Sequence, residues 1–437
     1  MSGLPAYRDR DRLSRLIGDR RKLHRIPELS WTEFETTAVL CGELEALGYA
    51  VTWGEALYRH RRPHNPPPRE TLDEAYARAE RALGADNPYL PAMRGGFTGA
   101  VATLDGVEPG PVYGFRFDID ALPINESRSD GHAPSQAGFA SAHGGAMHAC
   151  GHDAHMAIGL GLARELARAR EHLKGRVHLF FQPAEEVAGG GIIFAGLPQL
   201  QETERFLTLH IGIVGERRIV CDATWVAARI FDARILGRSS HAGNAPEDGA
   251  NALLAACQAV QALYAIPRHS RGVSRVNVGR FRSDNANNVI ADEATFRFEV
   301  RGGDDDVCDF MTERARRIVQ SAAAMNGCEA RIVEVTHYAS CPNSPDMVAD
   351  LRAAAMRLGV PETALREAYQ VPASEDASFM IRAVNENGGK AAHVVLGCPV
   401  RGGHHNGGFD IDEDVLGWGV DVFREVVLKD TPDSAAR

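Results

Sequence analysis

The chain has 437 residues, of which 44% are hydrophobic and 24% are charged, a composition typical of a soluble globular protein. Its length exceeds that of one ordinary hydrophobic core and therefore predicts two domains. The formal net charge of −10 argues against a nucleic-acid partner, because phosphate binding needs a basic face, but a small anionic substrate could be held by one or two local arginines.

Two further features of the sequence bear on where the protein works. No stretch approaches the roughly 20 apolar residues of a membrane span, and the first ten residues hold no apolar signal segment. We therefore expect no membrane partner and a cytoplasmic location. The eight cysteines lack CxxC pairs, so we expect them to be reduced and mostly to be small buried side chains.

In chain order, the first half of the sequence alternates between helical and strand-like segments. Apolar spacing predicts two helices within residues 9–48, broken at Pro27, and a helix at 156–169. Strands are predicted at 100–104, 112–117, 176–181 and 205–209. Strands that alternate with helices indicate an α/β domain with a mostly parallel sheet and helices on both faces.

Residues 55–96 interrupt this pattern. They hold a stretch rich in Pro, His and Arg and then a charged helical run at 70–83. They could form an insertion that packs on the surface or at an interface. The alternative is a solvated loop and helix.

From about residue 225 the pattern changes. Strands are expected at 231–236, 275–279, 294–300 and 329–335, and helices at 251–264 and 304–325. Their order, βαββαβ, predicts a smaller α+β domain of ferredoxin-like type inserted at 226–335. The α/β pattern resumes with a helix at 347–358 and a strand at 392–396. Residues 1–225 and 336–437 would together form the larger domain.

Residue types that bind metals cluster in short segments of the larger domain. Cys150 and His152 flank Gly151, whose conformational freedom lets the chain turn so that a thiolate and an imidazole reach one metal. Taken alone, the pair could equally be a buried structural cysteine beside a surface histidine. A nucleophilic cysteine is a weaker alternative, because no base partner can be named for it.

Two adjacent carboxylates, Glu185 and Glu186, follow one predicted strand, and His210 ends the next. Sites of α/β proteins lie where the carboxyl ends of strands meet. One carboxylate could bind metal while the other moves a proton, so metal-assisted hydrolysis is the leading interpretation. A lone histidine at a strand end is more often structural, and His210 is favoured as a ligand only because the other candidates need partners.

Further polar residues are weaker candidates. Asp120 ends another strand and could ligate a metal, orient a ligand histidine, or cap a turn. In the inserted domain, His241 lies in a Gly- and Ala-rich turn and could stabilise an oxyanion. Arg301 could clamp a substrate carboxylate or form a surface salt bridge, and Asn288 lies in the same domain.

Several segments of the chain resemble those of a known family. They are GFRFDIDALPINE, MHACGHDAHMA, FQPAEE, LHIG, SSHAGNAPEDGANALLAA, NNVIAD, SEDASFM and GHHNGGFDIDED. In this order they resemble the M20 family of metallopeptidases and amidohydrolases across nearly the whole chain. Because it has a cysteine at this position, the MHACGHD segment resembles that of the aminoacylase-like branch of the family. Within that branch, segments 55–96 and 269–279 resemble those of the aminobenzoyl-glutamate hydrolase A subunits.

The resemblance implies a centre of two divalent metal ions, Mn²⁺ or Zn²⁺, with Cys150 as the bridge between them. The other implied ligands are His152, Glu186, His210 and a C-terminal histidine. That histidine is His404 if the His-His pair is aligned with the family, or His405 if the count runs back from Phe409. We prefer His404.

The resemblance also implies roles beyond the ligands. Glu185 would be the general base, and Asp120 would support the ligands from behind. The inserted domain would be a lid and dimerisation domain, whose His241 reaches the neighbouring subunit's site to stabilise the oxyanion. Asn288 and Arg301 would hold the substrate carboxylate.

The activity that the resemblance implies is hydrolysis of the amide bond of an N-acyl or N-aroyl amino acid such as aminobenzoyl-glutamate. Hydrolysis of auxin conjugates such as indole-3-acetyl-aspartate remains an alternative, as does deamination of an aromatic amine. A non-catalytic subunit of a heteromer is the alternative outside enzymes. The expected partners are a small anionic substrate and either a second copy of the chain or a paralogous subunit.

Overall fold

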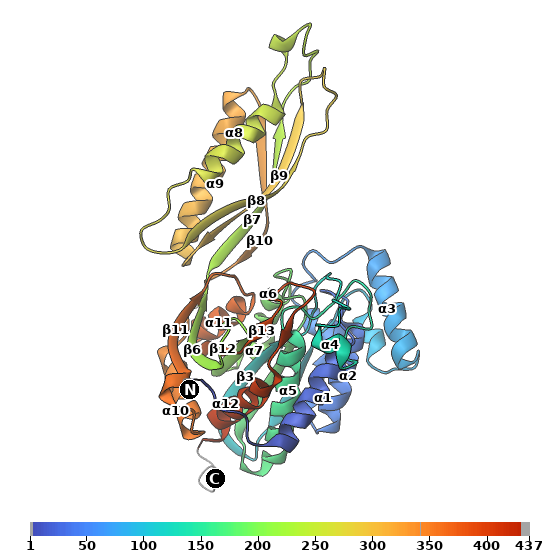
Figure 1. The fold of residues 1–437 in the computed structure, drawn as a ribbon, viewed down its shortest axis with the longest axis vertical. Helices are drawn as coiled ribbons and strands as arrows, with labels where there is room; N and C mark the ends of the chain where they lie inside the picture. The colour runs from blue at the N-terminus through green and yellow to red at the C-terminus, as the bar shows by residue number, and fades with distance from the viewer. Residues whose placement is uncertain (1–2, 341, 430–437) are drawn as a thin grey trace. The chain divides into compact units, whose positions relative to one another are not determined.

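The computed structural model describes residues 3–340 and 342–429, which fall into two compact units (Figure 1). Within these ranges, unit 1 comprises residues 3–224, 342–369 and 376–429, and unit 2 comprises 225–340 and 370–375. No helix in the described ranges is long and apolar enough to cross a membrane.

An eight-stranded sheet forms the centre of unit 1, in the order β1-β2-β4-β3-β5-β12-β6-β11. Its strands are β1 (Ala50–Trp53), β2 (Ala100–Asp105), β3 (Glu108–Asp118), β4 (Lys174–Gln182), β5 (Arg205–Ile211), β6 (Arg218–Trp225), β11 (Leu365–Val371) and β12 (Lys390–Gly397). The central strands β4, β3, β5 and β12 are parallel. β1 with β2, β2 with β4, and β6 with β12 pair antiparallel.

The expected α/β class is confirmed, and the parallel pairs join the four central strands, with antiparallel pairs on either side of them. β6 follows β5 after residues 212–217 alone. Such a connection is too short for the helical crossover that parallel strands need, so the chain reverses. The sheet is therefore mixed.

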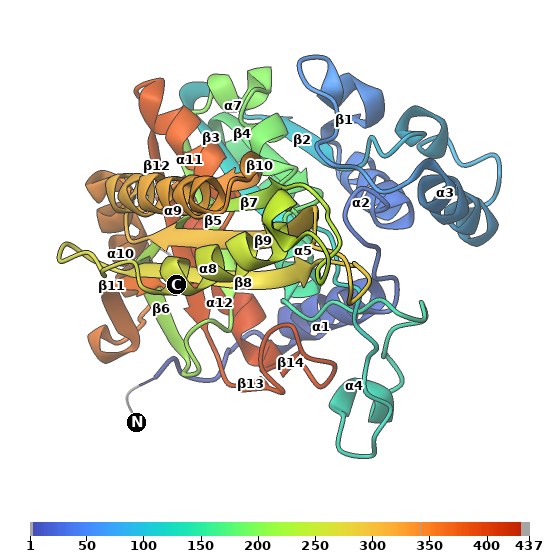
Figure 2. The ribbon, with the colours of Figure 1, turned by 90° about the horizontal axis from the view of Figure 1, so that it is seen from above.

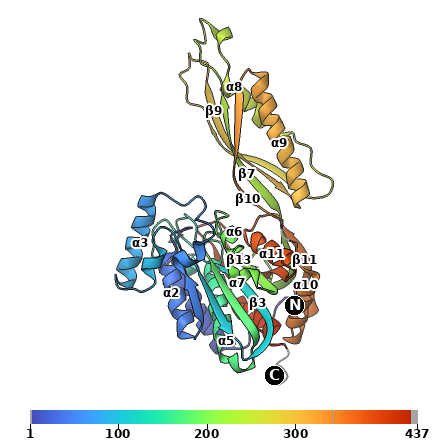
Figure 3. The ribbon, with the colours of Figure 1, turned by 180° about the vertical axis from the view of Figure 1, so that it is seen from behind.

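Helices cover both faces of this sheet (Figures 1 and 3). One face carries α1 (Arg10–His24), α2 (Phe34–Ala46), α5 (His152–Arg168), α10 (Pro345–Arg357) and α12 (Leu416–Leu428); the other carries α6 (Gly191–Phe194), α7 (Pro198–Gln201) and α11 (Ala377–Glu386). Strand alternation explains the two layers. Phe181 lies against Gly159 of α5, whereas its neighbour Phe180 lies against Phe194 of α6.

Segment 55–96 is packed within unit 1. It holds the end of the 3₁₀ turn η1 (Gly54–Tyr58), the helix α3 (Arg69–Leu83) and the turn η2 (Leu90–Met93). Figure 2 shows α3 beside α2, and the ring of Tyr76 packs edge-on against Phe34 at 5.4 Å. The helix predicted at 70–83 is confirmed, and its apolar side is buried rather than solvated.

Unit 2 has a four-stranded sheet in the order β10-β7-β9-β8, antiparallel at every pairing. Its elements are β7 (Ala227–Leu236), α8 (Ala252–Tyr264), β8 (Ser274–Arg282), β9 (Glu293–Gly302), α9 (Asp305–Met325) and β10 (Glu329–Tyr338). α8 and α9 lie side by side on one face of this sheet (Figure 1). Alternate residues of β9 are buried beneath them. The order βαββαβ is the predicted one.

Candidate metal centre

The Cys150–His152 segment forms the tight start of helix α5. Gly151 has φ +96°, a left-handed conformation that favours glycine. A Cβ atom at Gly151 would also lie only 2.5 Å from the side chain of Ile211. Because residue 151 is a glycine, this turn can pack closely against the carboxyl end of β5, where His210 lies. The local fold therefore brings Cys150 and His152 to His210.

Seven predicted side chains converge in unit 1: Cys150, His152, Glu185, Glu186, His210, His404 and His405. The Sγ atom of Cys150 lies 3.5 Å from Nε2 of His210 and 3.7 Å from Nδ1 of His404. Ligand atoms of Cys150, His152 and His210 lie within 4.8 Å of one another, and so do those of Cys150, Glu186 and His405. Cys150 thus belongs to two overlapping donor groups, which suits a bridging position.

The two C-terminal histidines lie on different sides of the cluster. They come from the loop between β13 (Val400–Arg401) and β14 (Asp410–Ile411). The ring of His404 packs near those of Phe409 and His210, at 5.0 and 5.5 Å. His405 is 54% exposed, and its Nε2 lies 3.5 Å from Oε2 of Glu186. Both histidines therefore remain within reach of the cluster.

Backbone carbonyls fix the tautomers of two ligand candidates. Nδ1 of His152 donates to the carbonyl of Asp120 at 2.8 Å, and Nδ1 of His210 donates to the carbonyl of Ile211 at 2.9 Å. With Nδ1 engaged in this way, Nε2 is the atom through which each ring would bind a metal.

A buried charged network lies behind the ligands. Nδ1 of His155 lies 2.5 Å from Asp118, and its Nε2 accepts the amide N–H of Ile211 at 3.0 Å. Arg116 in turn donates to Asp118 at 2.7 Å and to Asp376 at 2.9 Å. The network ties α5 to the end of β5 and so fixes His210. Its signals in the sequence are the alternating Asp118 and Asp120 at the end of a strand and the position of His155, one turn after His152 on the same helix.

Asp120 holds the turn that carries the two glutamates. Its carboxylate accepts the amide N–H groups of Glu185 and Glu186, each at 3.1 Å, and the hydroxyl of Ser30 at 2.7 Å. It is fully buried. Its carboxylate therefore positions the glutamates, while its carbonyl orients His152.

Burial sets the protonation of the cluster. It raises the pKa of Glu186 to about 7, with His152 opposing it, and raises the pKa of the Cys150 thiol well above its usual value. It lowers the pKa of His404 to about 4. Burial thus favours the protonated forms of Cys150 and Glu186. A divalent cation would displace the protons of Cys150 and Glu186.

Among the described residues of the cluster, three buried atoms make no hydrogen bond. They are Nε2 of His152 and Oε1 of Glu186, which lie 3.9 Å apart, and Nε2 of His404. Buried polar atoms are normally satisfied. The donor atoms at the cluster are Nε2 of His152, Oε1 of Glu186, Sγ of Cys150, Nε2 of His210 and Nδ1 of His404, the ring nitrogen that lies 3.7 Å from that Sγ. Nε2 of His404 lies on the Gly212 side of its ring. A cation of borderline softness accepts such nitrogen, sulfur and oxygen donors. The donor set therefore fits a metal centre.

The three candidates in unit 2 have local partners of their own. Nδ1 of His241 accepts two backbone N–H groups, from Gly243 at 3.2 Å and Asn244 at 3.1 Å. The carbonyl of Asn288 accepts the N–H of Ala242, so this residue lies beside the His241 turn. Arg301 is paired twice with Glu299, at 2.9 and 3.1 Å. A substrate carboxylate would have to compete with that glutamate.

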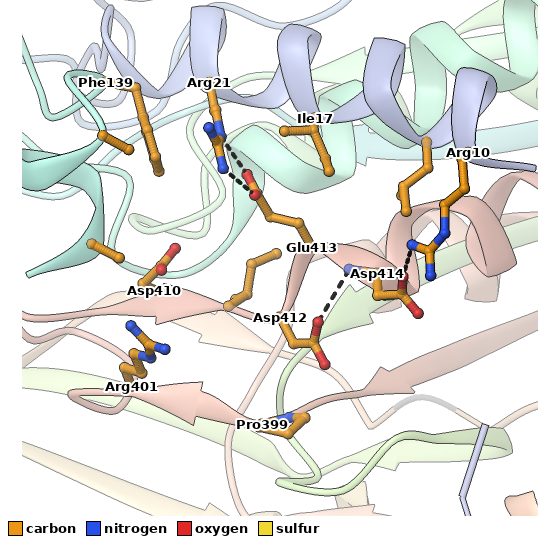
Figure 4. A pocket seen from close by; sticks show the side chains of 14 residues that line it. Arg10, Ile17, Arg21, Phe139, Pro399, Arg401, Asp410, Asp412, Glu413 and Asp414 are labelled. Carbon is orange, nitrogen blue, oxygen red and sulfur yellow. Dashed lines mark hydrogen bonds and ion pairs between the residues drawn. The ribbon is translucent and has the colours of Figure 1, made fainter. Parts of the chain in front are cut away.

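A separate cavity of about 480 Å³ lies between α1 and the β13–β14 pair (Figure 4). None of the described ligand candidates lines it. On its wall, Arg21 is paired twice with Glu413. Arg20, fully buried, joins Glu413 and Asp410 to Asp153 at about 3 Å each. Asp153 follows His152 directly, so this cavity borders a charged network behind the metal cluster.

Comparison with known proteins identifies the family. The model of peptidase family M20/M25/M40 matches residues 114–429. The chain belongs to the peptidase family M20/M25/M40. The resemblance seen in the sequence is thereby confirmed, and the M20 chain is a metallopeptidase-family hydrolase.

Two curated relatives match the M20 chain over 94% of its length and 94% of their own. One is the indole-3-acetyl-aspartic acid hydrolase of Enterobacter agglomerans, at 41% identity. The other is one of the subunits of the p-aminobenzoyl-glutamate hydrolase of Escherichia coli, at 40% identity.

Solved structures of M20 relatives share the fold. The aminobenzoyl-glutamate utilization protein of Klebsiella pneumoniae superimposes with a TM-score of 0.75 at 34% identity, covering 96% of each chain. A dinuclear metal-binding M20 peptidase of Bacillus subtilis superimposes with a TM-score of 0.69 at 26% identity, covering 96% of this chain and 99% of its own.

Proposed function

We propose that the protein is a dinuclear metal-dependent amidohydrolase that releases an acidic amino acid from an aromatic acyl group. The observation that carries the proposal is the buried cluster around Cys150, whose donors overlap in two groups. The aminobenzoyl-glutamate and indole-acetyl-aspartate relatives give the substrate class, an aromatic acid joined by an amide to glutamate or aspartate.

Five side chains are proposed as the ligands of two metal ions. Cys150 would bridge two ions, Mn²⁺ or Zn²⁺, and the other ligands would be His152, Glu186, His210 and His404. His404 is proposed over His405 because its ring lies against Cys150 and His210 on the buried side of the cluster. When bound, such ions acidify water and polarise an amide carbonyl.

Glu185 would do the proton transfer. It is buried, it neighbours the ligand Glu186, and Asp120 holds its backbone N–H. In this role it would take a proton from the attacking water and deliver it to the leaving amine.

The remaining roles belong to unit 2 and to a partner chain. Residues 226–335 would serve as a lid and dimerisation domain in which His241 stabilises the oxyanion of a neighbouring subunit's site. Asn288 and Arg301 would hold the substrate carboxylate. The Escherichia coli relative is by name one subunit of its hydrolase, which supports assembly with a paralogous subunit, whereas a homodimer is the alternative. We place the enzyme in the cytoplasm.

The test is an activity screen of the purified chain with Mn²⁺ or Zn²⁺ over p-aminobenzoyl-glutamate, indole-3-acetyl-aspartate and hippurate, together with an aromatic amine. We expect release of glutamate or aspartate. Glu185→Gln should keep its metal content and lose at least about a hundredfold in kcat, whereas the exposed Glu216→Gln should change neither. Normal turnover by Glu185→Gln would refute the mechanism. Ammonia release from the amine alone would refute the reaction.

A further inference from the structure

The turn that carries Glu185 and Glu186 has an unusual backbone. Ala184 and Ala188, on either side of the glutamates, have φ of +55° and +53°. Non-glycine residues rarely adopt such angles, and these persist only where the surroundings enforce them. Asp120 holds the turn from one direction. Another set of contacts must hold it from the other.

Those contacts come from the loop between α1 and α2. Trp31 is 1% exposed and has φ +69°. A Cβ atom on Gly189 would lie 2.5 Å from Cζ2 of its indole, so the turn packs directly on that ring. The preceding residue, Ser30, donates to the Asp120 carboxylate at 2.7 Å. Trp31 therefore packs on the turn directly, and its neighbour Ser30 holds the Asp120 carboxylate that supports the turn from the other direction.

Segment 55–96 fixes Trp31 in turn. The indole Nε1 donates to the carbonyl of His64 at 3.0 Å. The ring of Tyr58 packs edge-on against the indole at 6.2 Å. The backbone of Gly96 passes close to Trp31, because a Cβ atom there would lie 3.2 Å from its carbonyl oxygen. Three separate parts of the segment thus contact Trp31.

A second link runs through Glu33, which is fully buried. One of its carboxylate oxygens accepts the N–H of Ala184 at 2.8 Å, and the other accepts the hydroxyl of Thr98 at 2.7 Å. The hydroxyl of Tyr58 donates to the carbonyl of Thr98 at 2.7 Å. The strained residue Ala184 is therefore tied to segment 55–96 as well.

We infer that segment 55–96 is a brace for the glutamate turn, and that Trp31 is the positioning residue through which it acts. The inference rests on the proposed function, in which Glu185 moves the proton. Trp31 touches neither substrate nor ligands in this scheme. It keeps Glu185 and Glu186 in register with the cluster, and a displacement of about 1 Å at such a site can cost up to about a hundredfold in rate.

Trp31→Phe removes the hydrogen bond to His64 and the part of the ring that meets Gly189, while an aromatic ring remains. At saturating metal we expect kcat to fall about tenfold or more, with KM changed less than about twofold. Gly189→Ala perturbs the same contact from the other side and should act in the same direction.

Trp53→Phe is the matched control. Trp53 Nε1 also donates to a backbone carbonyl, that of Tyr89 at 3.1 Å, and its ring packs edge-on against Tyr89 at 5.3 Å. The contact joins β1 to Tyr89, a part of segment 55–96 other than the three that contact Trp31. The control should lower Tm as Trp31→Phe does but leave kcat unchanged.

A readout independent of turnover is hydrogen–deuterium exchange of residues 184–190, whose amides bond to Glu33, Asp120 and within the turn. Faster exchange there in Trp31→Phe but not in Trp53→Phe supports the brace. Equal exchange in both variants, or kcat in Trp31→Phe equal to that of the control, overturns it. If the wild type cleaves no substrate of the screen, the proposed function fails, and the exchange comparison alone decides the brace.

Discussion

His24 lies buried between two carboxylates, and this position makes stability depend on pH. Its Nδ1 lies 2.8 Å from Asp153 and its Nε2 lies 3.0 Å from Glu126. Since both partners are acceptors, both ring nitrogens carry protons and the ring is an imidazolium. Burial would lower its pKa, but hydrogen bonds and charge from Asp153 and Glu126 outweigh burial and raise the pKa to about 9.

The magnitude follows from linkage. In the unfolded chain the pKa of histidine is about 6.5, and a tenfold change in proton affinity corresponds to about 1.4 kcal/mol. The rise to about 9 therefore contributes roughly 3 kcal/mol. Because the folded-state pKa is raised, this contribution is fully present below pH 6.5 and is lost as pH rises through 9.

The assay is urea unfolding of the wild type and of His24→Gln between pH 6 and pH 9.5. Other groups titrate in both proteins and cancel in the difference. We expect the stability advantage of the wild type to shrink by roughly 3 kcal/mol across this range. A difference that stays constant with pH would show that His24 is not charged in the folded state and would refute the reasoning.

Three further predictions concern stability and metal binding. Arg20→Met should lower the free energy of unfolding in urea by about 3–5 kcal/mol, because it leaves buried carboxylates without their cation. The control is Arg21→Met. The Arg21 side chain is 39% exposed, so this change should lower the free energy of unfolding by about 1 kcal/mol or less. Gly159→Ala should lower the free energy of unfolding by about 1–3 kcal/mol, because the new methyl group would lie 2.8 Å from Phe117. The matched control is Gly18→Ala, where a methyl group would meet nothing within 4 Å. This control should raise the free energy of unfolding by up to about 1 kcal/mol. Adding metal to chelator-treated protein should release protons, measured by calorimetry in buffers of different ionisation enthalpy, and the release should fall as pH rises through the Glu186 pKa of about 7.

The convergence of His210 with Glu185 and Glu186 could be predicted from the sequence because these residues end or follow strands. Parallel strands bring their carboxyl ends to one edge, so His210 and the two glutamates had to lie near one another. The tie from Asp118 through His155 to Ile211 could not be predicted, because it depends on which side chains of three elements face each other in three dimensions.

Helix α12 shows the limit for secondary structure. Its sequence, LGWGVDVFREVVL, has two glycines and several valines, which disfavour an isolated helix. Tertiary packing explains its presence. Gly417 lets Tyr7 approach, and Gly419 fits against Ile158 of α5 and Leu396 of β12. A Cβ atom at either position would clash, so the residues that weaken the local signal are those that the packing requires.

The position of β12 in the sheet has a consequence for synthesis of the chain. β12 (Lys390–Gly397) lies between β5 and β6, which precede it by some 170 residues or more. On the ribosome, those two strands leave edges unpaired until β12 emerges, whereas the strands of unit 2 are all made before it. Unpaired edges recruit other chains. Translation that stalls before residue 390 would therefore yield a finished unit 2 joined to an aggregation-prone, incomplete unit 1.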